Sequence, residues 1–156
     1  MSLSTHIEKE LARLAVQGDG QLNVSVPNGR LLADCATVDV LACAFECLSY
    51  ETTEWANASI EYLQRRAAEL SARLSYLLES VSPIEIDNEA CVVQMRSNPP
   101  DQDGGSSKYY ELVVSRDGIR LSRYVKMAGQ PRHVVPAAVT REVFVRLAND
   151  FVATDG

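Results

Sequence analysis

The chain has 156 residues, of which 46% are hydrophobic and 23% are charged, and its formal net charge is −6 at pH 7. A chain of this length buries roughly 70% of its unfolded surface, so we expect a single globular domain over residues 1–156 that folds without a metal or a disulfide. No signal-like segment opens it and no apolar run approaches the roughly 20 residues that cross a bilayer, which predicts a cytoplasmic protein without membrane contact. The acidity argues against a nucleic-acid partner.

The first predicted element is a short amphipathic helix. Thr5 followed by Glu8 has the pattern of a capping box, which is typical of a helix N-terminus. Gly18 and Gly20 end the helix, because glycine readily takes the left-handed conformation that follows a helix C-terminus. The apolar stripe of this helix comprises Ile7, Leu11, Leu14 and Ala15.

A β-hairpin follows, with its turn predicted at Asn28-Gly29. Residues of these types tolerate the positive φ that a two-residue turn requires. Counting outward from this turn places Val26 opposite Leu31 on the neighbouring strand. The polar residues between these apolar positions point to the other face of the hairpin.

Residues 40–50 fit two structures. Their apolar side chains alternate as in a strand, and a subset of them also follows a helical stripe. We expect a third strand, because Cys and β-branched residues cluster there and the hairpin needs a partner strand.

A long helix is predicted from about Glu54 to Ser80, ended by Pro83. Its apolar seam extends about 40 Å at 1.5 Å per residue, which is longer than a small sheet is wide. The seam either crosses the core of this chain or mediates self-association. The candidate self-association residues are Ile60, Leu63, Leu70, Leu74 and Leu77.

After this helix we expect a strand region over residues 84–96 and then an internal loop. Residues 97–108 contain Pro99, Pro100 and two glycines among small polar residues, a composition typical of a flexible loop. The loop connects two strand regions that each have an apolar face, so it does not divide the chain into domains.

The second hairpin has its turn predicted at Asp117-Gly118. Counting outward places Val114 opposite Leu121 on a largely apolar face. Arg123 is the one charge on that face, and it serves either to protect a sheet edge or to pair with a neighbouring carboxylate. A final amphipathic helix is expected over about 140–152.

The other face of this hairpin is basic although the chain is acidic. Residues 116–156 carry seven basic residues against four acidic ones. Cations beside aromatic rings form a surface that can bind anions, but such a mixture also occurs on ordinary solvated sheets. The candidate ligand-binding or partner-binding residues are Tyr109, Arg120, Tyr124, Lys126 and Arg123.

No pattern in the chain predicts catalysis, a metal or a cofactor. The four cysteines have no zinc-site spacing and lie in apolar contexts, so we expect them to be reduced and buried. Glu85 and Asp87 alternate with isoleucines and are expected to be solvated. His133 has no identifiable catalytic partner.

These features predict an α+β domain with an antiparallel sheet built from the two hairpins, a long central helix and two terminal helices. The element order and the acidity are similar to those of small bacterial secretion chaperones, a resemblance that implies a dimer holding unfolded client segments. An extra strand after the long helix departs from that pattern. We therefore expect a noncatalytic protein-interaction module whose partner is another protein or a second copy of itself. The alternative is a small-anion-binding protein or an enzyme that uses the basic hairpin face.

Overall fold

The computed structural model describes residues 2–77, 80–98 and 101–153. Within these residues the chain forms three α-helices, a short 3-10 helix and ten strands. In chain order they are α1 (Leu3–Gln17), β1 (Gly20–Val26), β2 (Gly29–Val38), β3 (Ala42–Thr52), α2 (Ile60–Arg73), the 3-10 helix (Leu74–Leu77), β4 (Ser80–Asp87), β5 (Val92–Asn98), β6 (Asp101–Asp103), β7 (Ser106–Ser115), β8 (Gly118–Met127), β9 (His133–Val135), β10 (Ala137–Thr140) and α3 (Arg141–Ala153).

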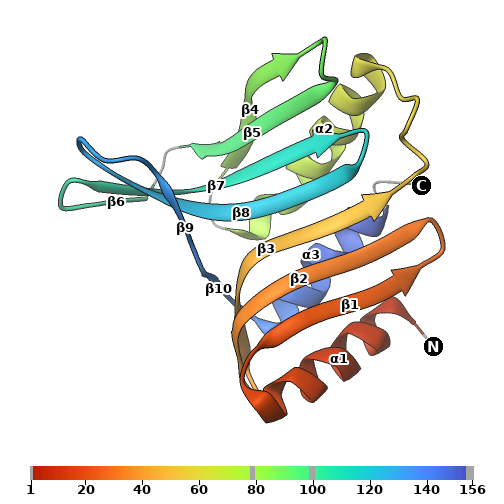
Figure 1. Ribbon diagram of the computed structural model, residues 1–156, viewed down its shortest axis with the longest axis vertical. Coiled ribbons are helices and arrows are strands. Elements are labelled where there is room, and N and C mark those ends of the chain that lie inside the picture. The colour runs from red at the N-terminus through yellow and green to blue at the C-terminus, as the bar shows by residue number, and fades with distance from the viewer. Residues whose placement is uncertain (1, 78–79, 99–100, 154–156) are drawn as a thin grey trace.

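The strands form one antiparallel sheet with the helices on one side. Its main path runs β1-β2-β3-β8-β7-β5-β4, while β6, β9 and β10 pair with β7, β8 and β3. α1 packs on β1 and β2, α3 on β3, and α2 on β5 and β7 (Figure 1). No helix in the described part of the chain covers the opposite side of the sheet, which we call the open face. The predicted α+β class, with both hairpins in an antiparallel sheet, is confirmed.

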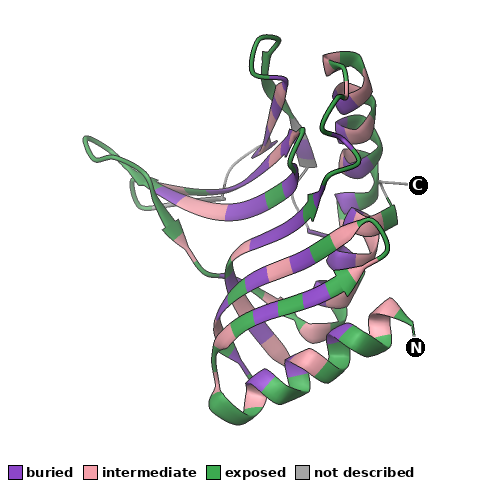
Figure 2. Cartoon of the chain, turned by 45° about the vertical axis from the view of Figure 1, so that its right-hand side comes forward, coloured by how far each residue is buried: buried purple, intermediate pink, exposed green. Residues whose placement is uncertain are grey.

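The hydrophobic core lies between the sheet and the helices, as the alternation of burial along the strands in Figure 2 shows. Each fully buried large apolar side chain contributes roughly 1.5–3 kcal/mol relative to leaving it in water. The largest fully buried side chains include Trp55, Tyr50, Phe45, Phe144 and Phe151. None of the helices in the described residues combines the length and apolarity needed to cross a membrane.

Two short strands occupy the place where β3 and β8 diverge. β8 pairs with β3 only from Gly118 to Leu121, and its residues 123–125 pair with β9 instead. The first residues of β3 pair with β10. In Figure 1 the β9–β10 segment runs from the far end of β8 back towards β3 and α3. The connection between β8 and β9 therefore turns back alongside β8, which brings Arg132 next to the sheet.

Both hairpins have the predicted faces but a register that differs by two residues from the expectation. Val24, not Val26, lies opposite Leu31. In the second hairpin Val114 lies opposite Ile119 rather than Leu121. A shift of two residues returns each side chain to the same face, so the division into core and open face survives the error.

The two turn glycines explain this shift. Gly29 and Gly118 are the first residues of β2 and β8, and both lie against the end of β3. A Cβ at Gly29 would lie 1.9 Å from the carbonyl oxygen of Glu51, and one at Gly118 would lie 1.9 Å from that of Tyr50. Each glycine is therefore required for close strand approach, and the turns consist of the two residues before it.

Thr52 at the end of β3 joins the two turns. Its hydroxyl donates to the carbonyl oxygen of Asn28 at 2.8 Å, and its backbone N–H donates to that of Asp117 at 3.0 Å. The same hydroxyl accepts from the backbone N–H of Glu54 at 3.1 Å. Because Thr52 is 6% exposed, these bonds are shielded from water and fix the three central strands at this end of the sheet.

The predicted long helix is wrong in its extent, because the described helix α2 spans only Ile60–Arg73. Ser59 caps its N-terminus, where the Ser59 hydroxyl accepts a hydrogen bond from the backbone N–H of Tyr62 at 3.2 Å. Residues 53–58 form a turn region that positions Trp55 in the core. The seam continues into the 3-10 helix because Leu74 and Leu77 still face the core, although the α-helical hydrogen bonding has ended.

Helix α1 begins earlier than the capping-box pattern predicts. Ser2, not Thr5, is the N-cap, and its hydroxyl accepts from the backbone N–H of Thr5 at 3.2 Å. Ser and Thr are both favourable N-caps, so the capping pattern alone does not distinguish Ser2 from Thr5. The predicted end is confirmed, since Gly18 has φ +90° and donates to the carbonyl oxygen of Leu14.

Between α2 and β7 the chain forms more strands than expected. Residues 84–96 are not one strand but parts of the hairpin β4–β5, whose turn contains Cys91 with φ +53°. The Asp87 carboxylate stabilises this turn by accepting from the backbone N–H groups of Glu89 and Ala90. Within the expected loop 97–108, β6 pairs with β7, while Pro99 and Pro100 lie outside the described residues.

Candidate binding site on the open sheet face

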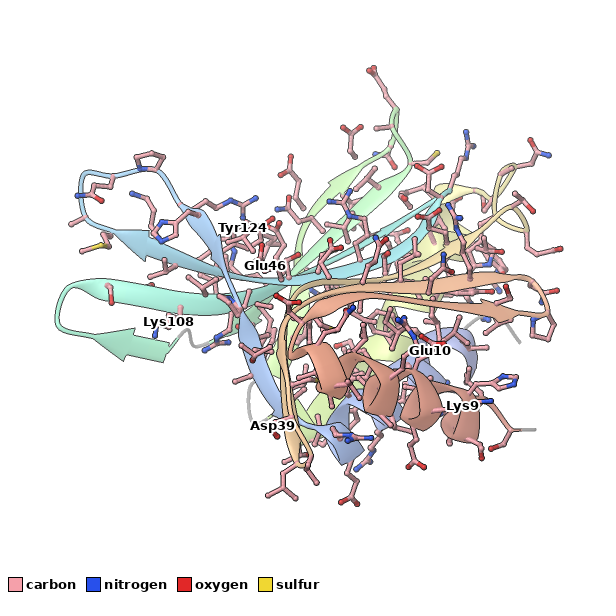
Figure 3. All side chains as sticks on the ribbon, turned by 60° about the horizontal axis from the view of Figure 1, so that its bottom comes forward. Lys9, Glu10, Asp39, Glu46, Lys108 and Tyr124 are labelled. Carbon is pink, nitrogen blue, oxygen red and sulfur yellow. The ribbon has the colours of Figure 1, made fainter. Side chains whose placement is uncertain are left out.

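The residues proposed from the sequence lie on both faces of the sheet. Tyr109, Tyr124 and Lys126 lie together on the open face, and Arg120 lies on the same face further along β8. In Figure 3 Tyr124 lies on the side of the sheet opposite the labelled helix residues Lys9 and Glu10. Arg123 instead faces the helices, with its guanidinium 4.5 Å from the ring centroid of Tyr110. The structure therefore separates Arg123 from the other candidates.

A pair of stacked tyrosines, each contacted by an arginine, forms the centre of the site. The rings of Tyr109 and Tyr124, which are opposite each other on β7 and β8, stack with centroids 6.0 Å apart and planes at 26°. The guanidinium of Arg96 lies 4.3 Å from the Tyr109 centroid, and that of Arg132 lies 3.9 Å from the Tyr124 centroid. Each such contact contributes roughly 0.5–1 kcal/mol at an exposed site. We call these four residues the Arg–Tyr stack.

A buried carboxylate fixes the two arginines. Glu111 on β7 has only 5% of its side chain exposed and accepts from the Nη1 and Nη2 atoms of Arg132 at 2.7 and 3.1 Å. The Gln94 amide also donates to it, and Arg96 Nη2 lies 3.8 Å away. Hydrogen bonding to Glu111 raises the pKa of the Arg132 guanidinium above its ordinary value. A carboxylate buried this deeply requires such partners, so it holds the arginines in place.

A pocket of about 380 Å³ adjoins the Arg–Tyr stack. We call it the basic pocket, and its lining residues are Arg96, Ser107, Tyr109, Lys126 and Arg132. The Lys126 ammonium donates to the backbone carbonyl of Met127 at 3.0 Å and to that of Gln130. These bonds hold the lysine against the β8–β9 connection at the rim of the pocket.

A broader depression crosses the open face at the other end of β8. It has a volume of about 920 Å³ and contains an ion pair between Arg30 and Glu51, whose Nη2 and Oε2 atoms are 3.1 Å apart. Because both partners of this pair are about half exposed, it contributes little to stability. We call the depression the polar trough, and its lining residues are Ser25, Asn28, Gly29, Arg30, Asp34, Cys47, Ser49, Glu51, Thr52, Thr53, Asp117 and Arg120.

The candidate self-association seam is covered by the chain itself. Leu63 and Leu70 are fully buried, Leu74 is 1% exposed and Leu77 is 7% exposed. Ile60 is partly buried and packs against the same core. The structure thus gives these residues the role of a core helix seam, which was the other interpretation of the pattern.

Other residues considered from the sequence do not join the site. Burial raises the pKa of the Cys35 thiol to about 11 and that of the Cys43 thiol to about 12. Glu85 and Asp87 line a separate depression near β4. Over the described residues, no group of three or more His, Cys, Asp and Glu side chains is arranged to hold a metal ion.

Sequence reasoning missed the residues that organise the site. Arg96 and Glu111 are opposite each other on β5 and β7, a pairing that cannot be seen before the order of the strands is known. Arg132 belongs to the C-terminal basic residues, but its distance in sequence from Glu111 hides their contact. The available signal was Glu111 itself, an acidic residue on the same predicted hairpin face as Tyr109 and Tyr124.

Comparison of the chain with protein-family models, with curated proteins and with solved structures finds no match.

Proposed function

We propose that the protein is a noncatalytic protein-interaction module that holds a segment of a partner protein on its open face. The observation that supports this proposal is the polar lining of two depressions on the open face, the polar trough and the basic pocket. Small-molecule sites are mostly apolar clefts of roughly 300–1,000 Å³ that enclose their ligand. The polar trough reaches about 920 Å³, but it is broad and lined by hydroxyls, carboxylates and arginines. Such a surface suits a chain segment better than a small apolar ligand.

Charge indicates which kind of segment fits. Three cations line the basic pocket on a chain whose net charge is −6, whereas the arginines of the polar trough are accompanied there by three carboxylates. A positive patch on an otherwise acidic protein attracts acidic partners and repels the negative remainder of its own surface. The proposed partner is therefore a cytoplasmic protein with an acidic segment, held as a chaperone holds a client.

A second copy of this chain is the alternative partner. The open face also has a depression of about 380 Å³ that is lined in part by Asp19, Asp34 and Glu46. Two copies related by a two-fold axis can place the acidic part of one face against the basic part of the other, because an isologous contact repeats each pair twice. This mode replaces self-association through the buried helix seam.

The proposal is tested by affinity capture from a native lysate with two charge-reversal variants. The first variant, Arg120→Glu with Lys126→Glu, changes the open face. The matched control, Lys9→Glu with Arg73→Glu, makes the same change of charge at exposed positions on α1 and α2. Circular dichroism before capture establishes that both variants are folded.

We expect the wild-type chain and the control to retain one defined protein that the open-face variant loses. Retention of an untagged copy of the same chain, with the same dependence on the variants, identifies the second copy as the partner. Equal loss from both variants, or equal retention by both, contradicts a role of the open face.

A further inference from the structure

The basic pocket concentrates positive charge at one place. Arg96, Lys126 and Arg132 all line it, whereas Glu111 is the only carboxylate among the described side chains that forms an ion pair with these cations. One carboxylate compensates one of the three cations, which leaves two positive charges without a counter-charge within the described residues. Cations that converge in this way repel one another unless an anion joins them.

Each cation is held in place before any ligand arrives. Arg132 is bound to Glu111 through both Nη atoms, and Arg96 lies on the ring of Tyr109. Lys126 is bound to two backbone carbonyls, and its third N–H group has no acceptor among the residues that the structure describes. Long basic side chains at a surface normally lose conformational entropy when they bind, and these have already lost much of it.

The Nε atom of Arg96 is a donor that lacks an acceptor. It is buried, and it has no hydrogen-bond partner within the described part of the chain. Buried polar groups are nearly always paired, so this Nε–H is a donor that the described residues leave unsatisfied, on a side chain whose exposed part lines the pocket. The hydroxyl of Ser107, which lines the same pocket, can supply a further hydrogen bond.

We propose that the basic pocket binds a phosphate group. A phosphate monoester carries about −1.5 to −2 charges at pH 7 and three acceptor oxygens, which match the two uncompensated cations and the donors of Arg96, Lys126 and Ser107. A carboxylate has one charge and two oxygens, so it leaves one cation uncompensated. The phosphate is supplied either as the free ion or by a phosphorylated side chain of the partner segment. Only the second source rests on the proposed function.

The test is an NMR titration of the arginine Nε–H signals with inorganic phosphate, at constant ionic strength maintained with sodium chloride. We expect a saturable shift of the Arg96 signal. The Arg96→Gln and Lys126→Gln variants, followed by isothermal titration calorimetry, should each weaken phosphate binding by about tenfold or more, because each loses a charge-assisted hydrogen bond. Arg120→Gln, which changes the same face outside the pocket, should bind as the wild type does.

A further variant tests the pocket with every cation retained. Ser107→Glu places a carboxylate among the three cations and should abolish phosphate binding while circular dichroism shows an intact fold. The proposal is overturned if chloride at equal ionic strength produces the same shift, or if folded Lys126→Gln and Ser107→Glu proteins bind phosphate like the wild type.

Peptides then distinguish the two sources of phosphate. A phosphoserine peptide that binds more tightly than inorganic phosphate, with the same loss in Lys126→Gln, supports a phosphorylated partner segment. Binding of inorganic phosphate with no gain from the peptide supports the free ion. Equal binding of the phosphoserine peptide and its glutamate analogue refutes selection of a phosphate group, and it leaves the proposed protein-interaction function standing.

Discussion

Replacing Glu111 with Gln keeps the shape of the side chain and removes the charge that organises the binding site. The substitution replaces one acceptor oxygen with an NH2 group, so one of the two hydrogen bonds from Arg132, at 2.7 and 3.1 Å, is lost and the other becomes a bond to a neutral acceptor. It also leaves Arg96 without its nearest carboxylate at 3.8 Å. A hydrogen bond to a charged group contributes about 1.5–3 kcal/mol and a neutral one about 0.5–1.5 kcal/mol. Since the Arg132 side chain is 36% exposed, solvent screening reduces this difference. We expect the free energy of unfolding to fall by about 1–2 kcal/mol.

The assay is urea unfolding followed by circular dichroism. The matched control is Glu10→Gln. It removes the carboxylate of the ion pair between Glu10 and Arg13, in which the Glu10 side chain is 30% exposed. That pair contributes about 0.5 kcal/mol or less, so the control should unfold almost as the wild type does. If Glu111→Gln and Glu10→Gln have the same midpoint and the same slope, the buried carboxylate does not stabilise the site and the reasoning is refuted.

Three further predictions concern the core. Thr52→Val should lower the free energy of unfolding by about 1–2 kcal/mol because its hydroxyl donates to Asn28, whereas the exposed Thr53→Val should change it little; equal urea midpoints contradict this. Leu70→Glu should give an unfolded chain, since Leu70 is fully buried; a folded product in circular dichroism places the seam outside the core. Burial raises the Cys43 pKa from 9.0 to about 12, so its contribution to stability is complete below pH 9 and is lost towards pH 12. Between about pH 8 and 10.5 the wild type should therefore lose more unfolding free energy than Cys43→Ala.

The sequence was sufficient to predict the fold class because the hairpin faces depend only on alternation. Its two turn predictions failed together, and for one physical reason. Gly29 and Gly118 are both required by the approach of β3, which is a long-range contact, and Gly118 in addition has φ +134°. Local turn chemistry cannot distinguish a glycine needed for positive φ from a glycine needed for close packing.

The binding site was predictable only in part. Alternation around the second hairpin correctly placed Tyr109, Tyr124 and Lys126 on one face, and the structure shows them together. Arg96 and Arg132 come from β5 and from the segment before β9, so their contribution depends on strand order and on the divergence of β3 from β8. No local pattern encodes either of these features.

The central claim, that a partner protein lies on the open face, is tested most directly by site-specific photocrosslinking in the native lysate. A benzophenone amino acid at Ser25 lies in the polar trough, and the same group at Ala12 lies on the exposed side of α1. We predict a discrete crosslinked product from Ser25, with a mass that identifies either a different protein or a second copy of the chain, and none from Ala12. Crosslinks from Ala12 and none from Ser25 would show that the partner binds the helical side, which contradicts the account.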